Sequence, residues 1–145
     1  MKIVLLGYMA SGKSTIGMLL SKALSMPFID LDAYIESKEK SSIKAIFNTK
    51  GEIYFRKIEH AHLCDLLDSE KDFVLSLGGG TPCYANNMDA IITAQQTTSF
   101  YLQASVSLLV DRLLKGRETR PLYKEIGDDK LEEYVAKNLF ERRFF

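Results

Sequence analysis

Short apolar runs alternate along this chain with longer stretches in which apolar residues recur at every third or fourth position. The short runs are typical of buried strands in a parallel sheet, and the longer spacing is typical of amphipathic helices. Strands are predicted at residues 3–7, 27–30, 73–77 and 99–102. Helices are predicted near residues 13–24, 31–38, 52–68, 86–95, 105–114 and 128–140. The alternation predicts an α/β fold with a parallel sheet.

Two parts of the chain depart from this alternation. Residues 32–60 show helical patterns in succession without a strand, and the shortest of them covers 43–48, with Ser41 or Ser42 as its N-cap. We expect this part to be a helical insertion beside the sheet. Residues 115–127 are charged, are flanked by glycine and have no period, so they are expected to form a mobile loop.

The first predicted strand and the first predicted helix are joined by residues 7–14, Gly-Tyr-Met-Ala-Ser-Gly-Lys-Ser. They fit the pattern G-x-x-x-x-G-K-[ST] in the strand–loop–helix context that gives the pattern its meaning. Its glycines allow backbone N–H groups to point at a polyphosphate, and the helix N-terminus adds partial positive charge. Lys13 would reach the β- and γ-phosphates, and the Ser14 hydroxyl would ligate Mg²⁺. The alternative is a chance match in an ordinary turn between a strand and a helix.

A pair of acids, Asp30 and Asp32, follows the second predicted strand. Residues i and i+2 of a strand point to the same side, so both carboxylates are expected to face the crevice at the carboxyl edge of the sheet. One would hold a Mg²⁺-bound water, and the other would accept a hydrogen bond from a substrate hydroxyl. The alternative is a helix N-cap together with a solvated acid.

Gly78, Gly79 and Gly80 follow the third predicted strand. Three glycines at this place would let the backbone approach a ligand closely and offer its N–H groups as donors; the alternative is a flexible turn. The strand itself contains no acidic residue, and Ser76 is its nearest polar side chain. Mg²⁺ coordination is therefore expected to depend on Ser14 and Asp30.

Four arginines are candidates for binding anions. Arg56 lies off the apolar face of its predicted helix, so the pattern alone indicates a surface arginine. Arg120 lies in the charged loop, where it would neutralise charge on a transferring phosphoryl group, and Arg117 would serve similarly. Arg112 is near the end of a predicted helix, and a surface arginine matched to the helix dipole is the simplest interpretation.

Composition excludes several classes of protein. The 145 residues suggest one domain, and 46% apolar with 26% charged residues is typical of a soluble globular protein. Lys plus Arg equals Asp plus Glu at 19 each, so no basic excess indicates nucleic acid or an anionic membrane as a partner. No apolar run approaches the length of a membrane span, and the chain begins directly with a predicted strand rather than a signal peptide.

The cysteines and histidines give no sign of a metal or redox site. Cys64 and Cys83 lack the C-x-x-C spacing, so free thiols in a reducing cytoplasm are expected, with a disulfide as the alternative. His60 and His62 are two positions apart on a predicted helix and do not share a face, so no zinc site is predicted.

Taken in order, these residues resemble the shikimate kinase family over almost the whole chain. The motifs that carry the resemblance are residues 7–14, Asp30-x-Asp32, Gly51-Glu52 with Phe55-Arg56-x-x-Glu59, Gly78-Gly79-Gly80, Arg120-Pro121-Leu122 and the closing arginines. The resemblance implies a three-layer P-loop kinase fold, with a central parallel sheet flanked by helices. It also implies a single domain over 1–145, with a helical substrate-binding region near 31–60 and a lid near 113–127.

The same resemblance implies a reaction. The γ-phosphoryl group of ATP would pass to the 3-hydroxyl of shikimate, giving shikimate 3-phosphate and ADP on the route to chorismate and the aromatic amino acids. Catalysis would involve Lys13, Asp32 and Arg120, and Mg²⁺ would be held by Ser14 and, through water, by Asp30. The implied ATP-binding residues are Ala10, Ser11, Gly12, Lys13, Ser14, Thr15, Arg112 (against adenine) and Arg120. The implied shikimate-binding residues are Asp32, Arg56 (with the substrate carboxylate), Gly78, Gly79, Gly80 and Arg142.

The chain departs from the family pattern near residue 145. Arg142 and Arg143 compete for the role of second carboxylate-binding arginine, and Arg142 is preferred. The last strand and C-terminal helix of the family have no counterpart in these residues. The partner is expected to be the small molecule shikimate, with no nucleic acid and no membrane, and the protein is expected to be a cytoplasmic monomer.

Three other functions compete with this one. A kinase for another small metabolite, such as a relative of gluconate kinase, would use the same arginines for a different acid. A GTP-dependent switch would usually carry N-K-x-D and D-x-x-G, and neither string occurs. A binding-only paralogue is disfavoured because Lys13, Asp32 and Arg120 are all present.

Overall fold

The computed structural model describes residues 1–116 and 126–142. Within them lies a sheet of four parallel strands in the order β2-β3-β1-β4, which confirms the predicted α/β class. The strands are β1 (Lys2–Gly7), β2 (Phe28–Asp30), β3 (Phe73–Ser76) and β4 (Thr97–Leu102). Each matches a predicted strand at one end and differs from it by one or two residues at the other.

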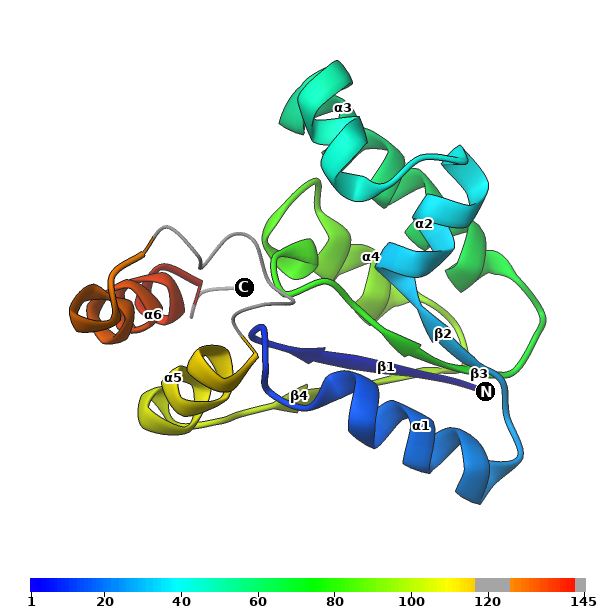
Figure 1. Ribbon diagram of the computed structural model, residues 1–145. Coiled ribbons are helices and arrows are strands. Elements are labelled where there is room, and N and C mark those ends of the chain that lie inside the picture. Colours follow the sequence, from blue (N-terminus) through cyan, green and yellow to red (C-terminus); the bar gives the residue numbers. More distant parts are fainter. Residues whose placement is uncertain (117–125, 143–145) are drawn as a thin grey trace.

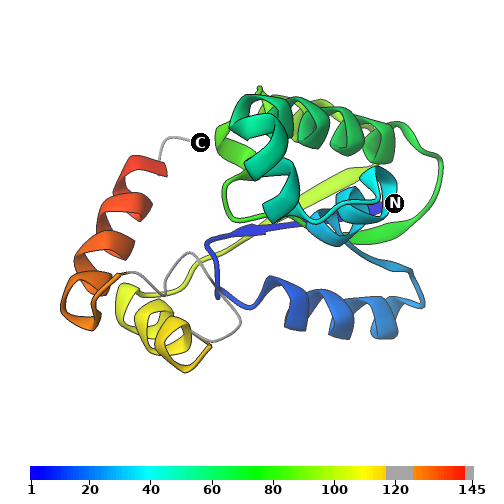
Figure 2. The same cartoon turned by 45° about the horizontal axis from the view of Figure 1, so that its top comes forward.

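Six α-helices connect and cover the strands in the described residues. They are α1 (Lys13–Leu24), α2 (Leu31–Glu39), α3 (Ile43–Asp68), α4 (Asn87–Thr93), α5 (Val106–Lys115) and α6 (Asp128–Arg142), with a short 3₁₀ helix η1 (Thr81–Cys83) before α4. Figures 1 and 2 show α1 on one face of the sheet and α3 with α4 on the other. This arrangement is the predicted three-layer architecture.

The two faces of β1 show why the sheet is covered on both sides. Val4 and Leu6 belong to the core beneath α2, α3 and α4, whereas Ile3 and Leu5 belong to a second cluster with Val74 on the α1 side. Adjacent residues of a strand point to opposite faces, so a strand buried on both faces must be apolar throughout. This explains the unbroken apolar run that marks the strand in the sequence.

The helices predicted at 43–48 and 52–68 are confirmed as two helical segments, which lie end to end in α3 and meet at a kink. The break is confined to Gly51, whose φ of 83° and ψ of 171° are not helical. Ser42 is the N-cap of α3, and its hydroxyl accepts a hydrogen bond from the Ala45 N–H at 3.1 Å.

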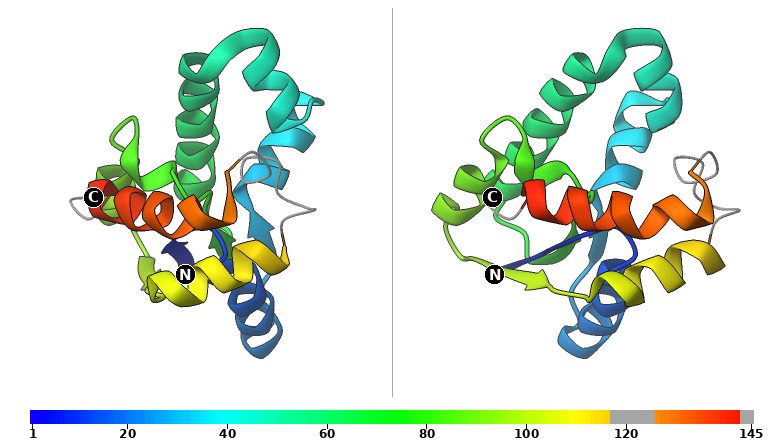
Figure 3. Two further views of the ribbon diagram at one scale, coloured as in Figure 1. Left: turned by 60° about the vertical axis from the view of Figure 1, so that its left-hand side comes forward. Right: turned by 90° about the vertical axis from the view of Figure 1, so that its left-hand side faces the viewer.

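A third apolar cluster joins α5 and α6, which pack side by side away from the strands (Figure 3). Leu109 and Leu113 of α5 meet Leu131 and Val135 of α6, and Tyr8 beside β1 completes the cluster. The packing brings the end of α6 back towards the carboxyl ends of the strands (Figures 2 and 3). Two helices distant in sequence from β1 therefore reach the loop that follows it.

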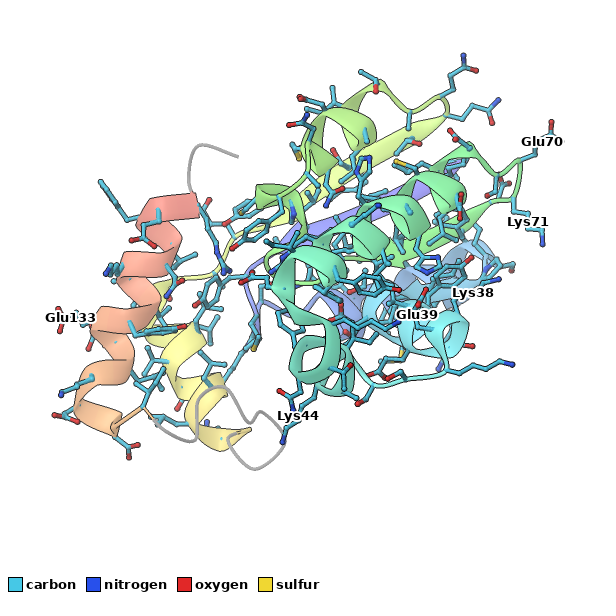
Figure 4. The ribbon with its side chains drawn as sticks, turned by 90° about the horizontal axis from the view of Figure 1, so that it is seen from above. Lys38, Glu39, Lys44, Glu70, Lys71 and Glu133 are labelled. Carbon is cyan, nitrogen blue, oxygen red and sulfur yellow. The ribbon has the colours of Figure 1, made fainter. Side chains whose placement is uncertain are left out.

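Charged side chains lie mainly on the outside. Glu70 and Lys71, between α3 and β3, and Glu133 on α6 point away from the molecule in Figure 4. None of the helices in residues 1–116 and 126–142 is both long and apolar enough to span a bilayer. Cys64 and Cys83 are free thiols, so the alternative of a disulfide between them is excluded.

Candidate active site

The loop between β1 and α1 has the backbone of a phosphate cradle. Ala10 has a φ of 67° and Gly12 a φ of 103°, so the chain curls through left-handed conformations before the helix. A Cβ atom on Gly7 (φ 150°) would lie 2.8 Å from the Leu102 carbonyl oxygen, so only glycine fits there. α1 then begins at Lys13 without a side-chain cap, which leaves its first N–H groups to a ligand.

This loop lines a hollow of about 450 Å³. Its lining comprises Ala10, Ser11, Gly12, Lys13, Ser14, Thr15, Ile16 and Arg112. All the residues predicted to bind ATP in the described part of the chain are therefore gathered in one place. Ser14 and Thr15 are exposed to the hollow, whereas the Ser11 hydroxyl is buried and has no hydrogen-bond partner among the described residues.

The ammonium group of Lys13 is held at the start of the loop. Its Nζ donates hydrogen bonds to the carbonyl oxygens of Gly7, at 2.8 Å, and Tyr8, at 2.9 Å. The side chain is buried, with 8% of its residue surface exposed. These contacts place a positive charge between the end of β1 and the helix N-terminus, where phosphate oxygens would be stabilised.

Arg112 reaches the same loop from α5. Its Nη1 donates to the Ala10 carbonyl oxygen at 3.0 Å, and its side chain is exposed. The simplest interpretation, an arginine that serves only the dipole of its own helix, is therefore incomplete. The predicted contact with adenine stays a prediction.

The two acids after β2 have different positions. Asp30 ends β2 and caps α2, since its Oδ1 accepts a hydrogen bond from the Ala33 N–H at 3.2 Å. Asp32 lies in the first turn of α2. The argument that both carboxylates share one side of a strand was therefore wrong, because the chain turns into a helix at Leu31.

Asp32 nevertheless faces the glycine loop after β3: a Cβ atom on Gly78 would lie 3.1 Å from its Oδ1. Burial raises the pKa of Asp32 to about 6, and the negative charges of Asp30, Glu59 and Glu36 act in the same direction. The positive charge of Lys13 lowers this pKa. Asp32 thus lies close enough to the phosphate loop to interact with its lysine, and it titrates in the range suited to a general base.

Each glycine of the loop after β3 approaches a different neighbour. Gly78 lies against Asp32, and a Cβ atom on Gly79 would come within 3.1 Å of the Met9 amide nitrogen in the phosphate loop. A Cβ atom on Gly80 would lie 3.4 Å from Arg56 Nη2 and 3.8 Å from Arg142 Nη2. Side chains at these three glycine positions would fill the space between Asp32, the phosphate loop and the guanidinium groups of Arg56 and Arg142.

Arg56 is not the surface arginine that its helical pattern indicated. Only 19% of its side chain is exposed, and its Nη1 donates to Glu59 Oε2 at 2.9 Å. The guanidinium carbon lies 3.9 Å from the centre of the Tyr84 ring. Nε lies 3.5 Å from Glu52 Oε1, an ion pair without hydrogen-bond geometry.

Arg142 approaches the glycine loop from the end of α6. Its Nη1 donates to the Gly79 carbonyl oxygen at 3.2 Å, and its guanidinium carbon lies 5.4 Å from the centre of the Tyr8 ring. Two cationic side chains from distant helices thus converge beside Gly80. The competing Arg143, and the loop arginines Arg117 and Arg120, lie outside the described residues.

A second hollow, of about 520 Å³, adjoins the glycine loop. Gly79 and Arg142 line it together with Cys83, but neither Asp32 nor Arg56 does. The convergence of side chains beside Gly78 and Gly80 defines the candidate site better than this larger space does.

Sequence reasoning gave no role to the polar groups behind Arg56. Glu59 is 1% exposed, and Thr81 and Asn87 are fully buried. The spacing of Arg56 and Glu59 at i and i+3 on a helix could have indicated their ion pair. Nothing local in the sequence indicates that Thr81 and Asn87 lie beside them.

Each histidine has a hydrogen-bonding neighbour in the described structure. His60 Nδ1 lies 2.8 Å from Asn87 Oδ1, and His62 Nε2 lies 2.9 Å from Glu39 Oε1. Within the described part of the chain, no group of three His, Cys, Asp or Glu side chains is placed to hold a metal ion. That these histidines form no zinc site stays a prediction from the sequence.

Comparison with known proteins identifies the family. The family model described as shikimate kinase matches residues 9–144. The shikimate kinase of Flavobacterium psychrophilum is 49% identical over 144 residues, which are 99% of this chain and 83% of that protein. The shikimate kinase of Flavobacterium johnsoniae is 48% identical over the same shares of the two chains.

Solved structures agree with these sequence matches. The shikimate kinase of Bacteroides thetaiotaomicron has a TM-score of 0.91 at 33% identity, covering 99% of this chain and 80% of that one. The shikimate kinase of Acinetobacter baumannii in complex with shikimate has a TM-score of 0.80 at 31% identity, covering 97% and 76%. A gluconokinase from Sinorhizobium meliloti, at 18% identity and a TM-score of 0.55 over 94% and 73%, shares the fold alone. The chain belongs to the shikimate kinase family.

Proposed function

We propose that this protein transfers the γ-phosphoryl group of ATP to the 3-hydroxyl of shikimate, giving shikimate 3-phosphate and ADP. The observation that carries the proposal is the convergence of Asp32, Arg56 and Arg142 on one glycine loop that touches the phosphate loop. An acid for a hydroxyl and two arginines for a carboxylate suit an acceptor that contains both groups. Membership of the family, and the relative in complex with shikimate, support this choice of acceptor.

The nucleotide would bind in the hollow at the start of α1. Backbone N–H groups of the loop and the helix N-terminus would hold the phosphate oxygens, and Lys13 would neutralise charge on the β- and γ-phosphates. Arg120 of the predicted lid would add a further positive charge. Phosphoryl transfer depends on alignment and charge neutralisation, so these contacts would supply most of the catalysis at this end.

The residues beside this hollow fit Mg²⁺. The Ser14 hydroxyl is exposed at the start of α1, and the Asp30 carboxylate lies at the carboxyl end of β2, on the same edge of the sheet. Both are oxygen donors, and Mg²⁺ bound with nucleotide phosphates usually keeps several waters and takes only one or two protein ligands. When bound, the ion supplies positive charge to the phosphates.

Asp32 would act as the general base for the acceptor hydroxyl. A pKa of about 6 leaves most of this carboxyl ionised at neutral pH, yet it keeps the group basic enough to take a proton. Arg56 and Arg142 would pair with the substrate carboxylate, and a bidentate contact would fix the orientation of the ring. Gly79 would donate its backbone N–H to the acceptor.

The proposed organisation of the chain follows the same division. Residues 31–60 would bind the acceptor, and residues 113–127 would close over the nucleotide and exclude water. Residues 117–125 of that lid lie outside the described residues. Monomeric state, cytoplasmic location and the absence of nucleic acid or membrane partners stay predictions from the sequence.

The proposal is tested by measuring ADP release with shikimate, gluconate and nucleoside monophosphates as acceptors. We expect shikimate to have the highest kcat/KM, and mass spectrometry should identify a monophosphorylated shikimate as the product. A higher kcat/KM for gluconate or a nucleotide would contradict the choice of acceptor. Tight ATP binding without turnover of any acceptor would favour a binding-only protein.

A further inference from the structure

A buried line of hydrogen bonds runs from Arg56 into the core between α3 and α4. Glu59, 1% exposed, accepts from Arg56 at 2.9 Å through Oε2 and from the Thr81 hydroxyl at 2.7 Å through Oε1. Asn87 Nδ2 donates to the Thr81 carbonyl oxygen at 2.8 Å. Asn87 Oδ1 lies 2.8 Å from His60 Nδ1, on the far side from the site.

The chemistry of the partners fixes the direction of each hydrogen bond. The Thr81 carbonyl oxygen can only accept, so the amide nitrogen of Asn87 must face it, and Asn87 Oδ1 must then accept from His60 Nδ1–H. An ionised Glu59 can only accept, so the Thr81 hydroxyl must donate to it. Cys64 Sγ lies 3.6 Å from His60 Nε2 at the end of this line. Reversing one bond would leave a neighbour without a partner.

Thr81 is the junction between this line and the candidate site. It follows Gly80 directly and begins η1, and both its hydroxyl and its carbonyl group are engaged. Asn87 therefore holds the end of the glycine loop, while Thr81 holds the carboxylate that orients Arg56. Asn87, together with Thr81, whose Oγ1 also lies close to Gly78, would determine where the guanidinium points.

We propose that Asn87 is a positioning residue for Arg56, acting through Thr81 and Glu59. The inference rests on the proposed function, in which Arg56 binds the acceptor carboxylate. Burying the amide of Asn87, the hydroxyl of Thr81 and the carboxylate of Glu59 costs free energy. Apolar residues of similar size would fill the same space without needing hydrogen-bond partners. Because these groups lead to a single guanidinium group, we infer that the network fixes the orientation of Arg56.

The main test compares Asn87→Asp with Asn86→Asp. At position 87 the exchange replaces the donor that faces the Thr81 carbonyl with an acceptor, whereas Asn86 is exposed and has no side-chain cap bond. The KM for shikimate should rise about tenfold or more in Asn87→Asp, with kcat and the KM for ATP within about twofold, since losing this bond displaces Thr81 and weakens its hydrogen bond to the Glu59 carboxylate. Asn86→Asp, with the same change of charge, should match the wild type. An unchanged KM for shikimate in folded Asn87→Asp would overturn the proposal.

A second pair of variants covers the case in which Asn87→Asp does not fold. Thr81→Val keeps the shape but removes the hydroxyl that donates to Glu59, and Thr81→Ser keeps that hydroxyl. Thr81→Val should raise the KM for shikimate about tenfold, and Thr81→Ser should restore it to within about threefold of the wild type. Thr93→Val, on the exposed face of α4, is the matched control. Equal effects of Val and Ser at position 81 would refute the hydrogen-bond role.

An acceptor without the carboxylate separates positioning from general damage. Shikimate with its carboxylate reduced to a hydroxymethyl group gives Arg56 no anion to bind. Thr81→Val should change kcat/KM for this analogue by about twofold at most, against about tenfold for shikimate. Equal losses for both acceptors would overturn the proposal. Failure of the proposed function would instead appear in the wild-type protein, as an absence of shikimate turnover before any variant is compared.

Discussion

The two ends of the candidate site are built in opposite ways. Apart from Arg112, the phosphate end is one continuous segment, residues 7–16, which contains the loop after β1 and the first turn of α1 with Lys13. The acceptor end collects Asp32, Arg56 and Arg142 from three helices around a loop that has no side chains. A site made of backbone within one turn depends on local conformation, whereas a site made of side chains from distant elements depends on the packing of the whole domain.

The largest effect expected at the acceptor end is the loss of the base. Asp32→Asn should lower kcat by about 10²- to 10⁴-fold, because the amide cannot take the hydroxyl proton. The dissociation constant for ATP, measured by calorimetry, should stay within about twofold, since the phosphate end is untouched. Asp65→Asn, on an exposed part of α3, is the control. Retained turnover in Asp32→Asn would remove this residue from the mechanism.

A smaller effect should distinguish the two ends, because a change at one end should raise the KM for one substrate only. Arg56→Lys keeps the charge but not the planar fork, so the KM for shikimate should rise about 10- to 100-fold. The KM for ATP should be unchanged within about twofold. Steady-state kinetics with each substrate varied in turn gives both values. A parallel rise in both KM values would mean that the two ends are not separable.

The phosphate end should be sensitive to backbone change. Gly7→Ala forces a Cβ atom against the Leu102 carbonyl oxygen at 2.8 Å, so the free energy of unfolding should fall by about 2 kcal/mol. Gly51→Ala, also at positive φ but with nothing within 4 Å, should cost about 1 kcal/mol. Urea denaturation measures both. Equal losses would show that φ, rather than the close contact, limits position 7.

The smallest effect concerns the pH dependence that Asp32 gives to activity and stability. Because its pKa is raised to about 6, kcat should increase as pH rises through this value and level off above it. Stability has the opposite sign: the folded protein holds this proton more tightly than the unfolded chain, so stability is lost as pH rises from the ordinary pKa of 3.8 to about 6. Asp32→Asn should therefore be more stable than the wild type at pH 7, by about 1 kcal/mol, but not at pH 4. An equal difference at both pH values would mean that the change in stability does not come from ionisation.

The same contrast explains how much could be predicted from sequence. The strand–loop–helix around Lys13 follows from local pattern, and the apolar runs of β1 and β3 are enough to predict a buried parallel sheet. The break at Gly51 also follows from local pattern, since the two predicted helices end at 48 and begin at 52. Asp32 was paired with Asp30 by strand alternation although the predicted helix 31–38 already contained it, so the error was to carry the two-residue period past the end of the strand.

The arginines of the acceptor end show where single-sequence reasoning stops. Helical periodicity put Arg56 at the surface, because Tyr84 and the glycine loop that cover it are remote in sequence. Its importance, and that of Arg142, could be inferred only from resemblance to a family. The partners of Arg56 beyond Glu59, namely Thr81 and Asn87, become visible only when the elements are packed.

The glycine triplet has a consequence for how enzymes of this shape diversify. In the proposed function, Gly78, Gly79 and Gly80 would offer the acceptor only main-chain atoms, and the groups that discriminate between acceptors would belong to the surrounding helices. A relative could therefore acquire a new preference by exchanging those outlying side chains one at a time, with the central loop left intact.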